Sequence, residues 1–270
     1  MKKIVIGVAV ALVSLFLILA IMIALSSTDG GASGGVAVAD GVLTVGVPED
    51  LTPYGIHWDE TEIAQLVGDI LAVPVELVPL LDENGLPATR AARLEALNSG
   101  KVDLILAQVG YDSTFDSNYL TSISYGSGGL YLANPLGTYL DTLAVMDGES
   151  LYVSDSIPSQ VMVEVPSMTN VVQYPQEDRL STLSQMSLGI AAGSEQYFLF
   201  TEEEAMSNSL GDNMMIRYMP LLSSPHMDYV GVANKGEGAL ISACNQAINE
   251  YLDALTATVG ESELESDEEG

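Results

Sequence analysis

The strongest constraint on the fold is an alternation of two hydrophobic periods near the start of the globular part. Short apolar, valine-rich runs occupy residues 41–48, 73–80 and 102–107. Between them, residues 60–71 and 89–97 place their apolar side chains at helical spacing. Strands of a parallel sheet are near-continuous apolar runs, and consecutive parallel strands need a crossover, usually a helix. The order therefore predicts a βαβαβ unit with a mainly parallel sheet.

A second, weaker round of the same alternation follows. Residues 150–154 and 170–174 are predicted strands, and residues 156–164 between them are a predicted helix. Residues 176–185 are expected to form another helix, and residues 188–192 another strand. A repeated strand–helix alternation predicts a second α/β unit rather than an extension of the first.

The chain then returns with one strand and one long helix. Residues 229–233 are an apolar run, and residues 238–255 carry an apolar face at helical spacing. About 220 residues lie beyond the first forty, which is enough for two lobes of about a hundred each. Hydrophobic residues make up 48% of the chain and charged residues 17%, so it can build a core. This predicts two α/β lobes around a cleft.

The amino terminus predicts a membrane anchor. Residues 4–25 carry no charge, and at 1.5 Å per residue they span about 33 Å as a helix. The preceding Lys2 and Lys3 place the amino terminus in the cytoplasm, so the globular part faces outside. An alternative is a cleaved signal with Ala37-Val38-Ala39 as the cleavage site, although signal cores are usually shorter. We expect residues 1–25 to form a retained single-pass transmembrane helix.

Two segments are expected to lie outside the lobes. Residues 26–40 follow the anchor and include the Gly/Ser-rich stretch SSTDGGASGG, which is typical of a flexible linker. Residues 259–270 include ESELESDEEG, with six acids and no base, and are predicted to form a disordered tail.

The charge balance excludes one class of partner. The chain has 37 acidic and eight basic residues, and its formal net charge is −29. Nucleic acid binding needs clustered lysines and arginines on phosphates, so no nucleic acid partner is expected. The single cysteine, Cys244, cannot form an intrachain disulfide, and its helical context predicts a buried, inert thiol.

Four stretches give the chain a resemblance to a known family. They are GVLTVGVPEDLTPYG at residues 41–55, ETEIAQLVGDILAVPVELVPL at 60–80, RLEALNSGKVDLILA at 93–107 and MDYVGVANKGEGALISACNQAINEY at 227–251. In this order they resemble the type II periplasmic binding proteins, specifically the family 3, polar amino-acid-type solute receptors. The third stretch is similar to that family's "ALxSGKVDLI" segment. The resemblance implies a two-lobed α/β fold of type II, which the transmembrane helix predicted from residues 4–25 would precede.

The resemblance also implies how the chain is divided. Lobe 1 would comprise residues 41–133 and a return segment at 227–258, and lobe 2 would comprise the insert at 134–226. The two crossovers would form a hinge, and a small solute would be bound in the cleft as the lobes close.

The family's site is only partly matched. Tyr54 stands where the family has an aromatic side chain, and a proline-fixed turn suits stacking on a ligand. The loop at residues 108–120 has neither arginine nor lysine, with Phe115 or Asp116 where the family has the arginine that binds a carboxylate. The predicted site residues are Tyr54, Gln108, Gly110, Tyr111, Asp112, Asp116 and Ser156. Without an arginine in the site, we expect a cationic or neutral solute and not a standard amino acid.

No motif of an enzyme or a metal site occurs. The sequence has no HExxH, no CxxC and no histidine pair at ligand spacing, so neither a metal nor another cofactor is expected. Two functions remain open. The first is an extracytoplasmic solute-binding protein serving an ABC-type permease or a sensor. The alternative is a degenerate receptor fold that acts as a membrane-anchored protein-interaction module without a small-molecule ligand.

Overall fold

The computed structural model divides the chain into two units, Met1–Gly35 and Val36–Gly270. All residues that the structure describes lie in the second unit. They are residues 41–48, 59–83, 85, 87–134, 143, 148–175, 181, 184, 197–207, 217–220 and 226–266. None of the helices within these residues combines the length and the apolar character that crossing a membrane requires. The predicted anchor at residues 4–25 lies outside the described residues.

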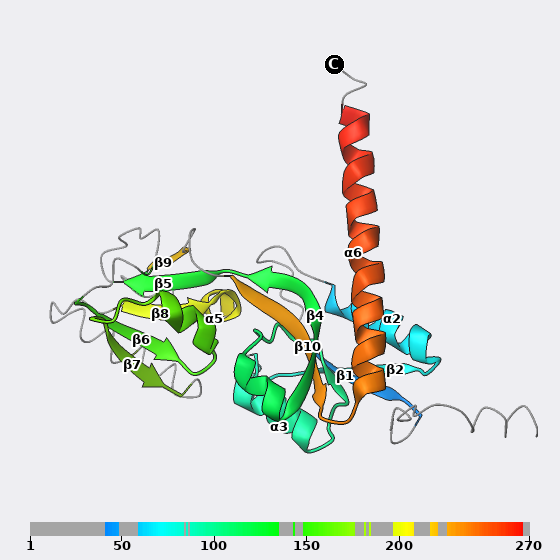
Figure 1. Cartoon of the computed structure of the whole chain (residues 1–270), viewed down its shortest axis with the longest axis horizontal. Helices are drawn as coiled ribbons and strands as arrows, with labels where there is room; N and C mark the ends of the chain where they lie inside the picture. Colours follow the sequence, from blue (N-terminus) through cyan, green and yellow to red (C-terminus); the bar gives the residue numbers. More distant parts are fainter. Residues whose placement is uncertain are drawn as a thin grey trace, which may run out of the picture. The chain divides into compact units, whose positions relative to one another are not determined.

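The first sheet has five strands in the order β2-β1-β3-β10-β4 (Figure 1). The strands are β1 (Leu43–Val47), β2 (Val75–Pro79), β3 (Leu104–Ile105), β4 (Tyr119–Gly128) and β10 (Met227–Asn234). β1 pairs in parallel with both β2 and β3, whereas β10 pairs antiparallel with β3 and β4. The predicted parallel βαβαβ unit is therefore confirmed. The predicted return strand at residues 229–233 is confirmed within β10.

Side-chain caps start the two helices of this unit where the sequence places them. α2 (Glu60–Leu71) begins after Asp59, whose carboxylate accepts a hydrogen bond from the Glu62 backbone N–H at 2.9 Å. α3 (Arg90–Asn98) begins after Thr89, whose hydroxyl accepts from the Ala92 backbone N–H at 3.2 Å. Each cap satisfies a backbone donor that has no partner inside the helix.

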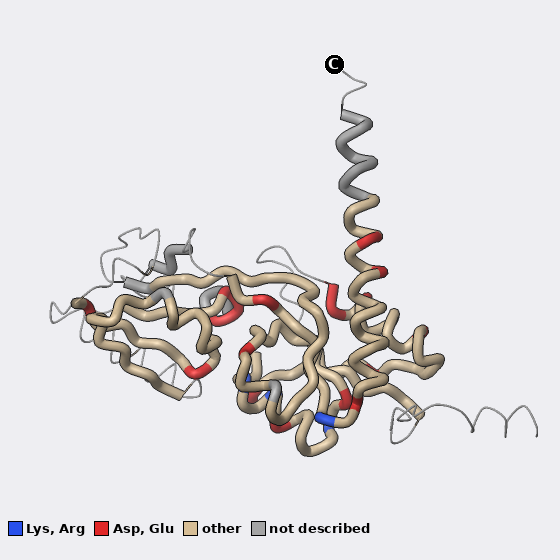
Figure 2. The backbone as a smooth tube through the Cα atoms, in the orientation of Figure 1, with Lys and Arg blue, Asp and Glu red and all other residues tan. Residues whose placement is uncertain are grey.

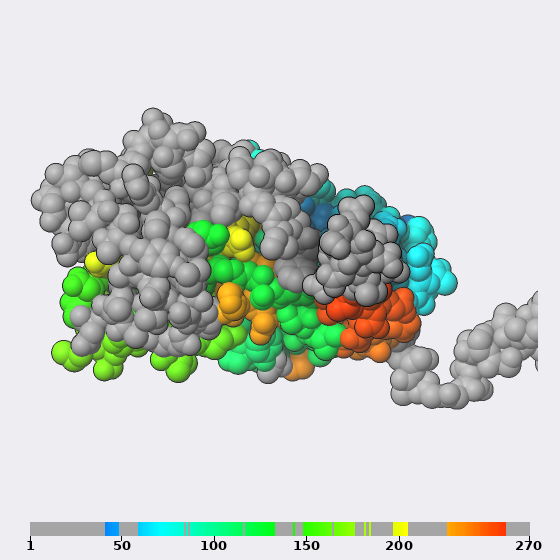
Figure 3. All heavy atoms as spheres, turned by 90° about the horizontal axis from the view of Figure 1, so that it is seen from above, coloured from blue at the N-terminus to red at the C-terminus, as the bar shows by residue number. Residues whose placement is uncertain are grey.

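The last helix, α6 (Gly238–Ser266), is longer than the sequence analysis predicted. Its amino-terminal part packs beside α2, and the two helices are neighbours in both Figure 1 and Figure 3. The disordered tail predicted from residue 259 is contradicted as far as Ser266, because the helix continues there. Glutamate and leucine are good helix formers, and the residues from 259 to 266 contain no proline.

Apolar side chains cover both faces of the first sheet. On one face, Ile63 and Val67 of α2 meet Cys244 and Ile248 of α6 in a buried cluster with Val45. On the other face, α3 packs its apolar side into a second buried cluster with β3 and β10. Cys244 is buried, as predicted, and burial raises the pKa of its thiol to about 12.

The second sheet has the order β7-β6-β8-β5-β9. Its strands are β5 (Leu130–Asn134), β6 (Ser150–Ser154), β7 (Asn170–Tyr174), β8 (Tyr197–Thr201) and β9 (Arg217–Pro220). β6 is parallel to β7 and β8, and β5 is antiparallel to β8 and β9. We call the elements of the first sheet with their helices lobe 1, and those of the second sheet lobe 2.

The sequence predicted lobe 2 less completely than lobe 1. The strands at residues 150–154 and 170–174 are confirmed as β6 and β7. Between them the structure has a 3₁₀ helix, η3 (Ser159–Glu164), instead of the helix predicted at residues 156–164, because Pro158 starts it late and the run is short. The predicted elements at residues 176–185 and 188–192 lie outside the described residues, apart from isolated helical positions.

β4, β5, β8 and β9 were not predicted. β4 alternates serine, glycine and large residues and carries no apolar run, so its period is hard to read from sequence. β8 runs in parallel beside β6, and the short helix α5 (Glu202–Ser207) follows it directly. Only Gly129 separates β4 of the first sheet from β5 of the second, so the chain passes between the sheets there, a few residues before the boundary predicted after residue 133.

Candidate functional site

Lobe 1 gathers charged side chains at the carboxyl edge of its parallel strands. In a βαβ unit the helix runs antiparallel to the strands, so its first turn lies at their carboxyl ends. Glu60 is the first residue of α2, and Arg90 and Arg93 lie in the first turn of α3. Gln108 follows β3 at the same edge. Ligands of open α/β sheets bind at this edge, so the topology alone makes it the candidate site.

Lobe 2 presents the same kind of edge. Ser154 is the last residue of β6 and Ser156 follows it, and Thr201, Glu203 and Glu204 lie at the carboxyl end of β8. β6 and β8 are parallel neighbours, so these two ends lie side by side. The ion pair of Arg93 with Glu203 and the hydrogen bond from the Ser159 backbone to Asp112 show that the two edges meet.

Arg93 links the lobes. Its side chain is almost fully buried, with 3% of the residue exposed. One terminal nitrogen donates a hydrogen bond to the Ala107 carbonyl, and the other forms an ion pair with the Glu203 carboxylate of lobe 2. The Nε of Arg93 has no hydrogen-bond partner among the described residues. A buried donor without a partner is costly, so this position is where a polar ligand atom would gain most.

Glu60 is a buried acid on the lobe 1 side. Burial raises the pKa of its carboxyl group to about 7, and the negative charge of Glu203 adds to the rise. The Tyr125 hydroxyl donates to Glu60 Oε1 at 3.4 Å and accepts from the Gln108 backbone N–H at 2.9 Å. Gln108 has a φ of 50°, a backbone conformation that residues other than glycine adopt rarely. The Tyr125 hydroxyl thus holds both the acid and a strained backbone turn in place.

Glu204 organises the lobe 2 edge. Its Oε1 accepts hydrogen bonds from Ser156 Oγ at 2.9 Å and from Ser154 Oγ at 3.3 Å. Its Oε2 accepts from the Thr201 backbone N–H at 3.0 Å. Only 1% of Glu204 is exposed, and these donors compensate the burial of its carboxylate. The turn after β6 is therefore tied to the end of β8.

Asp112 makes a second link between the lobes. Its Oδ2 accepts from the Ser159 backbone N–H of lobe 2 at 3.1 Å and lies 3.4 Å from Arg90. Burial by itself raises the pKa of Asp112, but hydrogen bonds from the Thr114 and Ser159 backbones and the charge of Arg90 outweigh it and lower the pKa. Arg90 also lies over the Phe115 ring, with its guanidinium carbon 4.6 Å from the ring centroid. Arg90 thus stacks on a residue that the resemblance placed where the family has its arginine.

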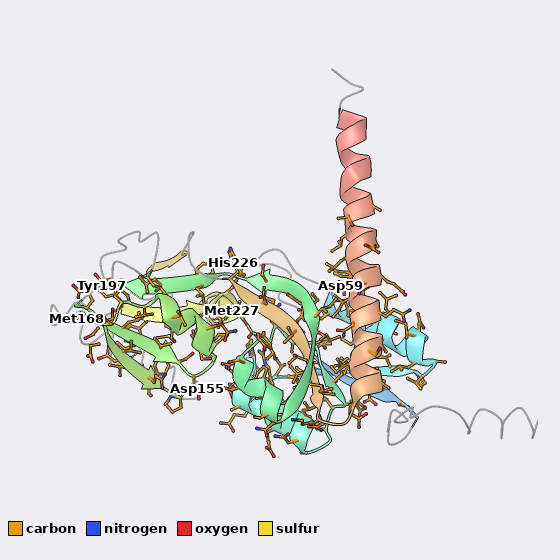
Figure 4. The ribbon with its side chains drawn as sticks, in the orientation of Figure 1. Asp59, Asp155, Met168, Tyr197, His226 and Met227 are labelled. Carbon is orange, nitrogen blue, oxygen red and sulfur yellow. The ribbon has the colours of Figure 1, made fainter. Side chains whose placement is uncertain are left out.

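A small cavity lies between the two edges, and we call it the junction cavity. Its volume is about 20 Å³, close to what one water molecule needs. Its lining comes from both lobes: Arg90, Arg93, Gln108, Val109, Gly110, Ser156, Thr201, Glu203, Met227 and Tyr229. Figure 4 labels Met227 at the start of β10, where the chain re-enters lobe 1.

The structure brings together part of the predicted site. Gln108, Gly110 and Ser156 line the junction cavity, as an interlobe site requires. Asp112 lies beside it in the link just described. The Tyr111 backbone carbonyl accepts a hydrogen bond from the Gln160 side chain of lobe 2, so Tyr111 also contacts the other lobe.

Two predicted residues are not placed at the cavity. Asp116 belongs to the 3₁₀ helix η1 (Ser113–Ser117), and its side chain is not described. Tyr54 lies outside the described residues. Across the described ranges, His, Cys, Asp and Glu side chains do not gather in a group of three or more that could hold a metal.

The expectation of a site without arginine is wrong. The loop after β3 has no arginine, but α3 delivers Arg90 and Arg93 to the same edge. Glu60 and Glu203 were missed as well, because each lies at the start of a helix and reads in sequence as an acidic first turn. The sequence did contain a signal for the two arginines. Thr89 is a helix cap and Arg90 and Arg93 follow it, and helix starts lie at the binding edge of a parallel sheet.

Comparison with known proteins shows the fold. No protein-family model matches the chain, and no curated protein matches it. Solved structures of other proteins, in contrast, match most of the chain. Holo ArgBP from T. maritima is 15% identical with a TM-score of 0.51, over 78% of this chain and 91% of that one. AbpA from Streptococcus pneumoniae, an amino acid ABC transporter substrate-binding protein bound to L-arginine, is 17% identical with a TM-score of 0.51, over 80% and 91%. An ancestral arginine-binding protein bound to glutamine is 20% identical with a TM-score of 0.51, over 79% and 92%.

These likenesses confirm the predicted architecture. Each covers most of this chain and nearly all of the solved structure, so the shared part is the complete two-lobed α/β body. The resemblance to type II periplasmic binding proteins, inferred from the order of segments, is thereby confirmed at the level of the fold.

Proposed function

We propose, from the fold that this chain shares with amino-acid ABC transporter substrate-binding proteins, that it binds a small solute between its two lobes. One observation carries the proposal. Arg93 is buried at the junction, lines a cavity with Glu203 of the other lobe, and has an Nε without a partner among the described residues. Buried polar groups that converge from two lobes on one hollow are characteristic of a ligand site.

The charges around the junction favour a solute with a net positive charge. Two arginines and five acids lie there: Arg90, Arg93, Glu60, Asp112, Glu202, Glu203 and Glu204. Figure 2 shows acidic positions along both lobes and few basic ones. An excess of carboxylates in a cleft raises the local concentration of cations and repels anions.

Amino acids belong among the candidates. Their exclusion from the sequence rested on a site without arginine, and Arg93 removes that basis. L-arginine is the first compound to test, because it has a net positive charge and its carboxylate can bind a guanidinium through two hydrogen bonds. It is also the compound bound to AbpA.

The wider role follows from the amino terminus and the fold together. Residues 4–25 would tether the globular part to the outer face of the membrane, behind the linker at residues 26–40. A tethered receptor can deliver its solute to an ABC-type permease or report it to a sensor protein. Membrane fractionation of the full chain and of a variant without residues 4–25 tests the tether. We expect the full chain in the membrane fraction and the variant without residues 4–25 in the soluble fraction.

The binding experiment is thermal unfolding of the full chain with a panel of amino acids, polyamines and inorganic cations. A compound that binds only the folded state stabilises it by about 2.7 kcal/mol at a hundredfold excess over Kd. We expect a cationic compound to raise Tm, and Glu203→Gln to weaken that compound at least tenfold. Glu95→Gln is the matched control, because Glu95 is an exposed acid on α3 away from the cavity. If no compound in the panel changes Tm, the proposal fails.

A second candidate is a receptor fold without a small-molecule ligand that binds a partner protein. The small volume of the junction cavity, about 20 Å³, favours it, because the Arg93–Glu203 pair already fills the place that a solute would take. The same panel separates the two: no shift with any compound, together with capture of a membrane partner by the full chain, would establish the interaction module.

A further inference from the structure

A second and much larger hollow lies next to the junction cavity, and we call it the lateral hollow. Its volume is about 320 Å³, at the lower end of the range for small-molecule sites. It is lined by Arg90, Asp112, Val153, Ser154, Asp155, Ile157, Ser159, Met162 and Gln173. Among these, Arg90 also lines the junction cavity, so the two spaces share one wall.

The walls of the lateral hollow are fixed by hydrogen bonds. The Asp155 backbone N–H donates to the Tyr174 carbonyl at 3.1 Å, which ties the turn after β6 to β7. The Ile157 N–H donates to the Ser154 carbonyl at 3.2 Å and closes that turn. Figure 4 labels Asp155 on this turn. A site whose walls are already ordered loses less conformational entropy when a ligand binds.

Arg90 is held in position at the boundary between the two spaces. Its guanidinium lies over the Phe115 ring, 3.4 Å from the Asp112 carboxylate, and it donates to the Asp155 carbonyl at 3.5 Å. Its charge is therefore largely balanced by Asp112. The remaining lining combines three apolar side chains, Val153, Ile157 and Met162, with neutral polar groups that include Gln173, and with one exposed acid, Asp155. Apart from this exposed acid, the lining suits an uncharged, amphipathic group better than an ion.

Neighbouring residues of the turn face different spaces. Ser156 lines the junction cavity, whereas Asp155 and Ile157 line the lateral hollow. Arg90 and the turn at residues 155–157 therefore separate the two spaces. A solute bound at Arg93 and Glu203 would reach the lateral hollow by extending past Arg90. The junction cavity alone, at about 20 Å³, is far smaller than an amino acid side chain with its backbone.

We infer that the lateral hollow is a second subsite, which takes the uncharged, amphipathic extension of an elongated solute whose charged head binds at the junction of the lobes. The inference rests on the proposed function, since the head group needs the interlobe site. It names the ligand class as a solute about the size of a dipeptide, with a cationic head and a neutral body.

The test compares two probes on the full chain by isothermal titration: L-argininamide, and arginyl-leucine amide, which has the same two positive charges and adds one neutral leucine residue. The dipeptide amide should bind at least about tenfold tighter than L-argininamide. Gln173→Trp places a large ring at the hollow and should remove that advantage while leaving the Kd of L-argininamide unchanged. The matched control is Val171→Trp, two residues away on the same face of β7 and also exposed, which should keep the advantage.

The outcomes separate the subsite from the function. Equal binding of the two probes, or an equal loss of both in Gln173→Trp, overturns the subsite and leaves the proposed function standing. An advantage of the dipeptide amide that persists in Gln173→Trp also overturns the subsite. If neither probe binds and the wider panel gives no shift, the proposed function and the subsite fall together.

Discussion

The two lobes bring different charges to the place where they meet. Lobe 1 supplies both arginines, Arg90 and Arg93, from the first turn of α3, beside its own acids Glu60 and Asp112. Lobe 2 supplies Glu203 and Glu204 from the start of α5. Both sets lie at carboxyl edges of parallel strands, so the same topology produces both. The difference teaches that the lobes are complementary to each other before any solute is considered. A solute has to compete with, or add to, an ion pair that the chain makes with itself.

The largest test of this complementarity removes one partner of the pair. Arg93→Met leaves the Glu203 carboxylate buried without its partner, which should lower the free energy of unfolding by about 3–5 kcal/mol. Urea unfolding followed by circular dichroism measures it. The double variant Arg93→Met with Glu203→Leu should recover most of the loss, because an apolar pair carries no desolvated charge. A single variant within about 1 kcal/mol of the wild type would show that the pair does not hold the lobes together.

The next test concerns Glu60, the acid on the arginine side. Its pKa is about 7 in the folded protein against an ordinary 4.5, so the unfolded chain ionises first as pH rises. Stability contributed by the protonated group is complete below about pH 4.5, falls up to about pH 7, and stays constant above it. Glu60→Gln avoids the loss and should be more stable than the wild type at pH 8 by roughly 3 kcal/mol.

The measurement is urea unfolding of the wild type and of Glu60→Gln between pH 4 and 9. The control is Glu62→Gln, which changes an exposed acid in the same helical turn. If the stability difference between Glu60→Gln and the wild type does not depend on pH, burial of the Glu60 carboxyl group is not its cause.

A third test addresses the crossover between the lobes. A Cβ at Gly128 would lie 1.7 Å from the Tyr229 hydroxyl oxygen, whereas at Gly129 it would meet nothing closer than a Tyr131 ring atom at 3.7 Å. Gly128→Ala should therefore destabilise the protein by about 1–3 kcal/mol through overpacking, and Gly129→Ala should be within about 0.5 kcal/mol of the wild type. Thermal unfolding of the two variants compares them. Equal losses of stability in the two variants would contradict the role of the Tyr229 hydroxyl in restricting position 128.

The smallest test compares a tyrosine from each lobe. Tyr125→Phe removes the acceptor of the Gln108 backbone N–H and a donor to Glu60, which should cost about 1 kcal/mol. Tyr152 of lobe 2 stacks on Phe198 at 4.5 Å between ring centroids, so Tyr152→Phe keeps its main contact and should cost less than about 0.5 kcal/mol. Urea midpoints of the two variants give the comparison. A larger loss of stability in Tyr152→Phe than in Tyr125→Phe would contradict the expected order.

The same contrast between the lobes appears in what could be predicted from the sequence. In lobe 1, caps at Asp59 and Thr89 and continuous apolar runs mark every strand and α-helix before β4. These signals are local, so periodicity and capping chemistry are sufficient to find them. In lobe 2, β8 stands before three consecutive glutamates and η3 is too short for a helical period. Such elements are stabilised mainly by neighbours in the sheet, which a single sequence does not reveal.

The site divides in the same way. The loop residues Gln108 and Gly110 and the turn residue Ser156 were predicted, because each directly follows a recognisable strand. Arg93 and Glu203 were not predicted as a pair, because 110 residues of chain separate them and each has an ordinary local context.

By itself, the sequence determined the strand–helix alternation of lobe 1, the strands β6 and β7 of lobe 2, the order of the lobes, the excess of acidic residues and the absence of a basic loop after β3. These are properties of periods, caps and composition, which depend on near neighbours in the chain. Only the tertiary structure decided that α3 supplies the arginines, that lobe 2 supplies their acid, and that a hollow of about 320 Å³ opens beside them. The physical reason is that ion pairs and cavities arise where distant segments meet, and burial there sets both their pairing and their pKa values.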